Sequence, residues 1–438
     1  MAERPARSGT DVTKASGPTT VRTRGAAGSA GNAPKVRPRL RLIRPDRPRR
    51  ARDPVHDARV DLRLLTGATF FLTAAGLVMV LSAGSVSAAQ GYDGNSFWYF
   101  QRQILYAICG LIAAILIARL PYRAWQALSL PLLVGSAVLM LVAAHPTSGT
   151  ALYGASRWID LGPITLQPSE FAKLALVAFS ATILAKKWNK LGEIGHVLIP
   201  LAPVVLIVAA LGVLQRDLGT TVILCGSVFM MLFVAGIRMR YLVATGAAGL
   251  AAAAYLIFDE AYRRTRFLDS WITPQSDPQG SGYQLIQSLV AIGSGGWTGT
   301  GLGTSRAKWD FLPNAHSDFI FAVIGEEMGL LGALAVVIAF GVLLYAGVRI
   351  AVRAPDTFGR LLAAGIVAWI GLQAIINMGA VTGLLPITGV PLPLVSFGGT
   401  ALVVTLAGVG VLASVARATA RPRERRQRGR GTTSRAAA

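Results

Sequence analysis

The stretch LLTGATFFLTAAGLVMVLSAGSV, residues 64–86, contains no charged side chain. About 20 consecutive apolar residues are needed for a helix that crosses the hydrocarbon core of a bilayer, which is roughly 30 Å thick. No apolar run of this kind precedes it, so we expect no cleavable signal peptide at the start of the chain. The run is therefore interpreted as the first membrane anchor.

Nine further apolar runs of spanning length follow the first one. They lie at about 103–120, 126–144, 169–186, 195–213, 218–237, 241–258, 318–346, 360–383 and 396–416. Of the 438 residues, 53% are hydrophobic and only 15% are charged, which excludes a soluble protein of two or three domains. The sequence predicts an all-α integral membrane protein of about ten transmembrane helices.

The charge of the chain is concentrated at its two ends. Residues 1–63 hold 16 Lys and Arg against six Asp and Glu, and residues 417–438 hold eight Arg against one Glu. Both segments are rich in Arg, Pro, Gly, Ser and Ala, so we expect disordered basic tails around a polytopic domain at 64–416. No aromatic residues alternate with the basic ones, which disfavours nucleic-acid binding. Retention on the cytoplasmic side, against anionic lipid, explains the charge better.

Lys and Arg in the short connections predict the orientation, because such residues are retained in the cytoplasm. Every second connection is basic, and these connections contain Arg119, Arg123, Lys186, Lys187, Lys190, Arg238, Arg240, Arg349, Arg353 and Arg360. Both termini then lie in the cytoplasm. The outer face receives the connections 87–102, 145–168, 214–217, 259–317 and 384–395. The long connection 259–317, before the eighth helix, is rich in Gly and aromatic residues, so we expect it to be functional.

Asp318 stands where this long outer segment enters the membrane again, and it is the first candidate for chemistry. His316 and Lys308 precede it, and Glu326 and Glu327 follow within the next apolar run. An Asp at a helix start can also cap free backbone N–H groups. An ionisable residue at membrane depth is nevertheless a functional candidate, and a carboxylate can take a proton from a hydroxyl.

Two polar segments precede the fourth apolar run, RWI at 157–159 and QPSEFAK at 167–173. An Arg beside a Trp, as at Arg157 and Trp158, suits pyrophosphate and sugar binding, although such a Trp can also belong to the interfacial belt. Glu170 and Lys173 are three residues apart and share one helix face. They either neutralise each other within the membrane or take part in catalysis.

Two further motifs lie at the predicted outer boundary. The turn QRDLGT at 215–220 places the charges of Arg216 and Asp217 there. The segment GVPLPLVSFGGT at 389–400, which includes Ser396, combines prolines and glycines and predicts an irregular, re-entrant backbone. Substrate lining and plain helix breaking are both open for this segment. No Cys and His spacing indicates a metal site.

Together these motifs resemble the SEDS family (shape, elongation, division and sporulation), whose branches include FtsW and RodA. The resemblance extends from about 64 to 416. It adds DPQGSGYQLIQSLVAIGSGGWTGTGLG at 277–303 and LPNAHSDFIFAVIGEEMG at 312–329 to the motifs above. Asn314, Ser317 and Arg216 depart from the Glu, Thr and Pro that the family commonly has. The Arg-rich tails favour the FtsW branch, which serves cell division, over the RodA branch.

The resemblance implies a peptidoglycan glycosyltransferase that polymerises lipid II at the outer face of the cytoplasmic (inner) membrane during septal cell-wall synthesis. It implies a class B penicillin-binding protein, an FtsI-type transpeptidase, and other divisome proteins as partners. The family's essential Asp corresponds to Asp318 and its essential outer-loop Trp to Trp158. Further substrate-binding residues are expected at Arg157, Glu170, Lys173, Arg216, Asp217, Gln287, Lys308, His316 and Ser396. No cofactor is assigned, although a divalent cation could assist.

Three alternatives are compatible with parts of the sequence. A RodA-type elongation polymerase shares the core motifs. A lipid II flippase would use buried charges such as Glu170, Lys173 and Asp217 as a transport path. It would need polar groups through the full depth of the bilayer, whereas here they gather at the outer boundary. A non-catalytic scaffold would rely on the tails, and tail docking is compatible with catalysis.

Overall fold

The computed structural model describes residues 54–145, 150–152, 155–160, 162, 165–259, 264–265 and 267–420. The expectation that the basic tails are disordered concerns residues 1–53 and 421–438, which lie outside these ranges. Residues 54–63 and 417–420, which the sequence assigned to the tails, are helical.

Ten long helices dominate the described part of the chain, and each overlaps one predicted apolar run. They are α1 (Pro54–Gly91), α2 (Trp98–Arg119), α3 (Ala124–Ala144), α4 (Pro168–Lys186), α5 (Ile194–Leu214), α6 (Leu218–Val234), α7 (Met239–Asp259), α10 (Ile320–Arg353), α11 (Thr357–Val381) and α12 (Gly399–Ala420). Among the described residues, nine of these helices are long and apolar enough to cross a membrane, and α6 is a shorter apolar helix. The predicted class, an all-α multi-pass membrane protein, is confirmed.

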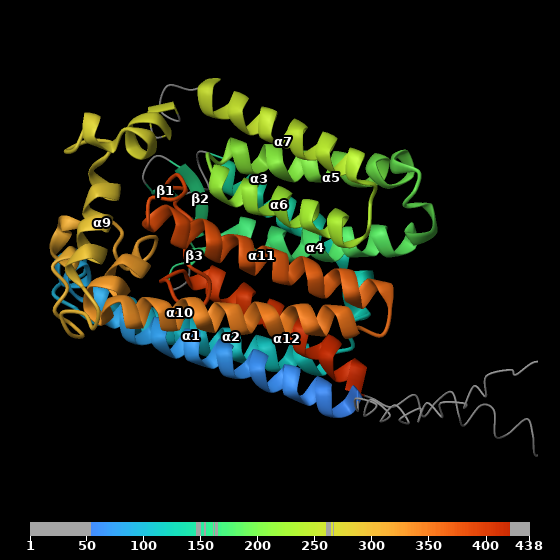
Figure 1. Cartoon of the computed structure of the whole chain (residues 1–438), viewed down its shortest axis with the longest axis horizontal. Coiled ribbons are helices and arrows are strands. Elements are labelled where there is room, and N and C mark those ends of the chain that lie inside the picture. Colours follow the sequence, from blue (N-terminus) through green and yellow to red (C-terminus); the bar gives the residue numbers. More distant parts are fainter. Residues whose placement is uncertain are drawn as a thin grey trace, which may run out of the picture. The chain divides into compact units, whose positions relative to one another are not determined.

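The helices lie side by side, with α12 in the interior and α7 at the periphery (Figure 1). In the most apolar part of α12, 94% of the residues are buried, against 6% in α7. The α12 helix packs against α1, α2, α4, α10 and α11. At Gly410 a Cβ atom would lie 2.6 Å from the backbone oxygen of Ala114 on α2. A glycine is needed there because small residues let membrane helices approach closely.

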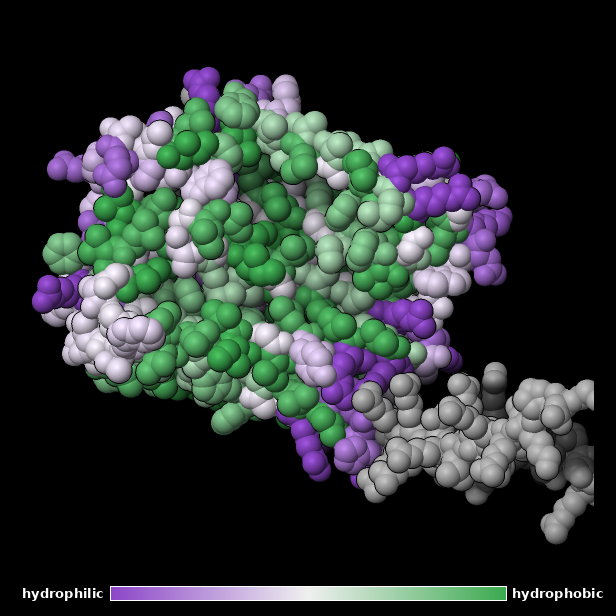
Figure 2. Space-filling view, in the orientation of Figure 1, coloured by the Kyte–Doolittle hydropathy of each residue, from purple (hydrophilic) through white to green (hydrophobic). Residues whose placement is uncertain are grey.

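The outer surface of the helices is apolar over its middle. On the face shown in Figure 2, hydrophobic residues cover the centre and hydrophilic residues gather toward the ends. Side chains such as Val243, Leu250 and Tyr255 on α7 are largely exposed. In water they would form an unfavourable patch, but in a bilayer they contact lipid tails.

The beginning of α1 and the end of α12 lie at the same end of the helices, here called the terminal end (Figure 1). Asp61 of α1 is buried there between Arg349 and Arg353 of α10, at 2.6 Å from each. Asp57 lies 3.0 Å from Arg353. These ion pairs explain why α1 starts at Pro54, earlier than the apolar run, because its first two turns are held by charge.

The opposite end, here called the loop end, carries a small antiparallel sheet that the sequence did not indicate. Its strands are β1 (Thr150–Leu152), β2 (Ala155–Asp160) and β3 (Thr165–Leu166), in the order β1-β2-β3. Trp158 is paired with Thr150, and Ile159 with Leu166. The sheet occupies the predicted outer connection 145–168. Its strands are too short and too polar to give a recognisable periodic pattern.

The long segment 259–317 is structured over much of its length, as its composition indicated. It contains η2 (Leu268–Ile272), η3 (Pro274–Ser276), α9 (Tyr283–Ser294) and η4 (Ala307–Phe311). The α9 helix packs against α10 and α11. The Ser288 hydroxyl donates to the carbonyl of Val381, at the last residue of α11, over 2.8 Å. The segment is thereby fastened to the membrane helices.

Residues 382–398, between α11 and α12, form no helix or strand. This agrees with the irregular backbone predicted for 389–400, except that Gly399 and Thr400 already belong to α12. Most side chains of 390–396 are buried. A Cβ atom at Gly76 would lie 2.6 Å from the backbone oxygen of Val395, so α1 passes this segment with no side chain between them. The irregular backbone is therefore packed within protein, which is the condition for such a structure at membrane depth.

Because the beginning of α1 and the end of α12 lie at the terminal end, the two termini are expected on the same side of the membrane. In a variant with Cys109→Ala and Cys225→Ala, a cysteine introduced at Gln275 should react with a membrane-impermeant maleimide in intact cells. A cysteine at Lys190 should react only after permeabilisation, because its connection is basic. Both positions are exposed. Labelling of position 190 from outside, or protection of position 275, would contradict the orientation.

Candidate active site

A buried ion pair lies near the start of α4. Pro168 occupies the first helical position, which suits a residue without an N–H group. The Lys173 ammonium lies 2.8 Å from Glu170 Oε1, and each side chain is 1% exposed. The pair that the sequence suggested is therefore formed and withdrawn from solvent. Opposite charges make this tolerable, because a single unpaired charge would be costly at this depth.

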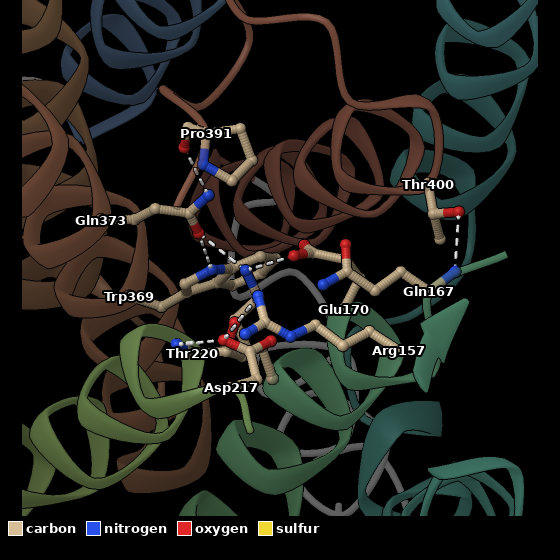
Figure 3. A network of polar contacts seen from close by, with 10 residues as sticks. Arg157, Gln167, Glu170, Asp217, Thr220, Trp369, Gln373, Pro391 and Thr400 are labelled. Carbon is tan, nitrogen blue, oxygen red and sulfur yellow. Dashed lines mark hydrogen bonds and ion pairs between the residues drawn. The ribbon is translucent and has the colours of Figure 1, made fainter. Parts of the chain in front are cut away.

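Two residues of α11 complete the surroundings of the Lys173 ammonium (Figure 3). Lys173 Nζ donates to Gln373 Oε1 over 2.7 Å, and Trp369 Nε1 donates to the same oxygen over 3.0 Å. The ammonium also lies 5.4 Å from the centre of the Trp369 ring. In contrast, Glu170 Oε2 has no hydrogen-bond partner among the described residues.

A second charged group lies at the turn between α5 and α6 (Figure 3). Asp217 caps α6 by accepting from the Thr220 N–H over 3.1 Å. The Arg157 side chain reaches this turn from β2 and donates to the backbone oxygens of Gln215 and Arg216. Its guanidinium lies 4.0 Å from Asp217 Oδ1. Arg157 therefore fastens the small sheet to the turn.

Arg216 has a backbone φ of +56°, in the left-handed region. This conformation costs a residue with a side chain about 1–2 kcal/mol. Proline, which the SEDS family often has at this position, could not adopt it because its ring fixes φ near −65°. Arg216 is also the exposed residue of the turn.

The segment that precedes α10 and carries Asp318 is bound by groups from later parts of the chain. The backbone oxygen of His316 accepts from the N–H of Phe397 over 3.0 Å. The oxygen of Ser317 accepts from the Ser396 hydroxyl over 2.5 Å. The oxygen of Asp318 accepts from the side-chain amide of Asn377 over 2.8 Å. Asn314 adopts a φ of +58°, which asparagine tolerates better than most residues. The N–H groups of Ser317 and Phe319 donate to the carbonyl oxygen of Asn314.

His316 is packed between aromatic rings. Its ring centre lies 4.1 Å from that of Tyr99 and 5.8 Å from that of Phe397. Burial lowers the pKa of the His316 imidazole to about 4, so the ring is uncharged at pH 7. This packing adds a side-chain contact to the backbone bonds that hold the Asp318 segment.

Gln373 and Asn377 lie one turn apart on α11 and connect the two groups of residues. Gln373 Nε2 donates to the oxygen of Pro391 over 2.9 Å, and Asn377 Nδ2 donates to that of Val390 over 2.8 Å. Two adjacent carbonyls of the irregular segment are thus bound by side chains of one helix face. One amide also contacts Lys173, and the other contacts the backbone of Asp318.

Residues 63–421 match the cell cycle protein family of FtsW, RodA and SpoVE. The chain belongs to this family. The resemblance to SEDS proteins that the sequence motifs carried is confirmed.

Two curated relatives match this chain over nearly the whole of their own length. A protein of Geobacter metallireducens named probable peptidoglycan glycosyltransferase FtsW is 43% identical over 357 residues, which is 82% of this chain and 94% of that protein. The stage V sporulation protein E of Bacillus subtilis is 41% identical over 354 residues, which is 81% of this chain and 96% of that protein.

The fold is also similar to that of a solved family member. A chain from a peptidoglycan synthase complex, studied for the structural coordination of polymerization and crosslinking, superimposes with a TM-score of 0.66 at 31% identity. The match covers 81% of this chain and 97% of the other. The overall arrangement of the chain is therefore similar to that of the solved protein.

The residues expected beside Asp318 have partners of their own. Lys308 donates to the backbone oxygen of Gly303. The Glu326 carboxylate accepts from the Arg306 N–H over 2.9 Å and from the Ser305 hydroxyl. Glu327 accepts from the Ser82 hydroxyl over 2.6 Å. These contacts connect the turn before η4 to α10, and Glu327 connects α10 to α1.

Two other residues that the sequence singled out, Gln287 and Trp158, lie on α9 and β2. Gln287 lies on α9, half-buried, outside the ion-pair network. Trp158 is half-buried on β2, next to Arg157. In the described ranges no group of three or more His, Cys, Asp or Glu side chains could hold a metal ion.

Sequence reasoning did not single out Gln373, Asn377 or Gln103. The Gln103 amide donates to the oxygen of Ser396 over 3.1 Å and so adds a third side chain that binds the irregular segment. A signal was present, because each is an amide within an apolar run, and polar groups at membrane depth need partners. The identity of those partners was not visible, since they lie far away in the sequence.

The buried ion pair predicts a stability effect. Replacing Lys173 by Met should destabilise the protein by about 3–5 kcal/mol, because Glu170 would be left as an unpaired buried charge. Adding Glu170→Gln to Lys173→Met should restore most of this loss. Thermal unfolding in detergent measures both effects, and Lys186→Met, at the exposed end of α4, is the control. Unchanged unfolding of the single Lys173→Met variant would show that the two charges do not depend on each other.

Proposed function

We propose that this protein polymerises lipid II into glycan strands at the outer face of the cytoplasmic membrane, in septal cell-wall synthesis. The observation that carries the proposal is the identity of 43% and 41% with two relatives, of which 94% and 96% of the length is covered. The activity named for the first of them, peptidoglycan glycosyltransferase, is the reaction class of this chain. Lipid II as substrate and the septum as location are the specific parts of the proposal.

The reaction joins the 4-hydroxyl of one lipid-linked disaccharide to the anomeric carbon of another, and undecaprenyl pyrophosphate leaves. It needs a base that takes the proton of the attacking hydroxyl. It also needs positive groups that stabilise the negative charge of the leaving pyrophosphate. The prenyl tails confine both substrates to the bilayer, which lowers the entropic cost of bringing them together.

Asp318 is the proposed base. It lies at the loop end, two residues before α10 begins, and is half-buried. Its carboxylate can therefore meet a sugar hydroxyl at the boundary of the membrane. The three bonds to the oxygens of residues 316–318 support this assignment, because a base must be held at a fixed distance and angle from its substrate.

Among the expected cations, Arg216 is the best candidate for the pyrophosphate. Lys173 and Lys308 are both buried, with 1% and 8% of the residue exposed. Arg216 is exposed at the turn before α6. Arg157 holds that turn and would contribute its charge from close by. Guanidinium groups suit this task because they form paired hydrogen bonds to phosphate oxygens.

The proposed partner is a class B penicillin-binding protein that crosslinks the product, together with other divisome proteins. The support is the similarity to a chain of a peptidoglycan synthase complex. With the loop end on the outer side, the candidate residues face the compartment in which crosslinking takes place. The basic tails would then lie in the cytoplasm, where division proteins can bind them.

The substitution Asp318→Asn tests the proposed base. Asn can cap a helix nearly as well as Asp but cannot accept the proton. We expect the rate of lipid II polymerisation to fall by about a hundred- to ten-thousand-fold, as is typical when a general base is removed. The measurement is glycan synthesis from purified lipid II by the protein together with its partner.

The matched control is Asp310→Asn, in the same long segment. Asp310 is exposed and has a φ of +65°, which Asn tolerates equally well. It should polymerise at the parental rate. If Asp318→Asn folds, binds the partner and polymerises lipid II at a similar rate to the parent, the assignment of Asp318 is wrong, and Glu170 becomes the next carboxylate to test.

Trp158 is proposed to contact the substrate or to shape its binding site. It follows Arg157 on β2 and is only half-exposed, unlike a belt residue that faces lipid alone. Trp158→Ala should lose most polymerisation while the protein still accumulates in the membrane. Trp309→Ala, which removes a well-exposed Trp of the loop end, should retain it. Near-normal activity of Trp158→Ala would favour the belt interpretation.

A further inference from the structure

The backbone just before α10 cannot satisfy its own carbonyl groups. The first α10 bonds run from the N–H groups of Ala322 and Val323 to the oxygen of Phe319. The oxygens of residues 316–318 therefore have no helical partners. A carbonyl that is withdrawn from water without a hydrogen-bond partner destabilises the conformation that buries it. The partners from Phe397, Ser396 and Asn377 are thus needed to hold this conformation.

The bond from Asn377 has the most direct relation to Asp318. It fixes the peptide plane that follows the Asp318 Cα atom, and this plane, with the one before it and the side-chain torsions, sets the position of the carboxylate. Both N–H groups of the Asn377 amide have acceptors at 2.8 Å, the oxygens of Asp318 and Val390. The side chain therefore bridges the start of α10 and the irregular segment.

Asn377 is buried within the helix bundle. Its side chain is 2% exposed and comes from the interior of α11. One turn earlier, Gln373 binds the neighbouring carbonyl of Pro391 and the Lys173 ammonium. A shift of the Asp318 backbone relative to α11 would have to break the Asn377 bond, and a shift of the irregular segment would break bonds to both amides.

We propose that Asn377 is a positioning residue for the Asp318 carboxylate. Through one amide it sets the orientation of the Asp318 peptide relative to α11 and to the irregular segment. This inference rests on the proposed role of Asp318 as the base. A purely structural Asn377 would satisfy two carbonyls and contribute only to stability, so the test must separate rate from stability.

The main variant is Asn377→Leu, which keeps the size of the side chain and removes both donors. We expect kcat for lipid II polymerisation to fall about tenfold to a hundredfold, since a displacement of about 1 Å in a reacting group can have this effect. The KM for lipid II should stay within about threefold of the parent, because Asn377 holds backbone and not substrate. Asn377→Ser, which keeps one donor, should give an intermediate kcat and provides a milder variant if Asn377→Leu folds poorly.

Ser288→Ala is the matched control. It removes a side-chain bond of the same length, 2.8 Å, to a backbone carbonyl at the same end of α11. It should lower the midpoint of thermal unfolding by an amount similar to that in Asn377→Ser, with kcat unchanged. A kcat of folded Asn377→Leu within about threefold of the parent would overturn the proposal. Where Asn377→Leu does not fold, a kcat of Asn377→Ser equal to that of the parent would overturn it. So would an equal loss of kcat in Ser288→Ala, because the effect would then reflect stability alone.

The two proposals fail in different ways. If Asp318→Asn polymerises at the parental rate, the role of Asp318 is wrong and the positioning role falls with it. If Asp318→Asn is inactive and the folded Asn377 variants have a normal kcat, the positioning role alone is wrong.

Discussion

The constraint on which the rest of the structure depends is the need to pair backbone polar groups inside a membrane protein. A helix satisfies its own carbonyls, but residues 382–398 and 316–318 do not form helices. Four of their oxygens, those of Asp318, Val390, Pro391 and Ser396, accept from side chains that α2 and α11 supply, namely Gln103, Gln373 and Asn377. Without such partners an irregular backbone would not be stable at this depth. The loop end can therefore carry a defined polar arrangement only because apolar helices contribute a few amides.

The same constraint explains the ion pair between Glu170 and Lys173. A buried ion pair is weak evidence for stability, because the cost of removing both charges from water can exceed their attraction. Here the Lys173 ammonium also has the Gln373 oxygen and the Trp369 ring, while one oxygen of Glu170 has no partner in the part of the chain that is described. The Lys173 ammonium thus has more hydrogen-bond and ring partners than the Glu170 carboxylate. Such asymmetry leaves a negative oxygen that a hydroxyl or a water molecule could bind.

The long helices could be predicted from the sequence because an apolar run of spanning length has few other structures available. The polar segments at the loop end could also be predicted from the sequence. So could the pairing of Glu170 with Lys173, because these residues are only three positions apart. The small sheet could not be predicted, since β1 and β3 are two or three residues long. Nor could the contact of Asn377 with Asp318, which are 59 residues apart. The motif made Asp318 conspicuous, whereas the group that holds it is one amide in an apolar helix.

The α11 helix is fixed at both ends by polar groups, and this suits it as the reference for the candidate site. At the terminal end Asp356 caps it, accepting from the Gly359 N–H over 2.8 Å and from the Tyr122 hydroxyl over 2.7 Å. Burial by itself would raise the pKa of Asp356, but these bonds and Arg123 outweigh it and lower the pKa. The cap therefore stays charged at neutral pH and favours the helix start. At the loop end Gln373 and Asn377 bind the irregular segment and the Asp318 backbone. Gln373 and Asn377, one turn apart on this helix, therefore link the Lys173 ammonium to the backbone of Asp318.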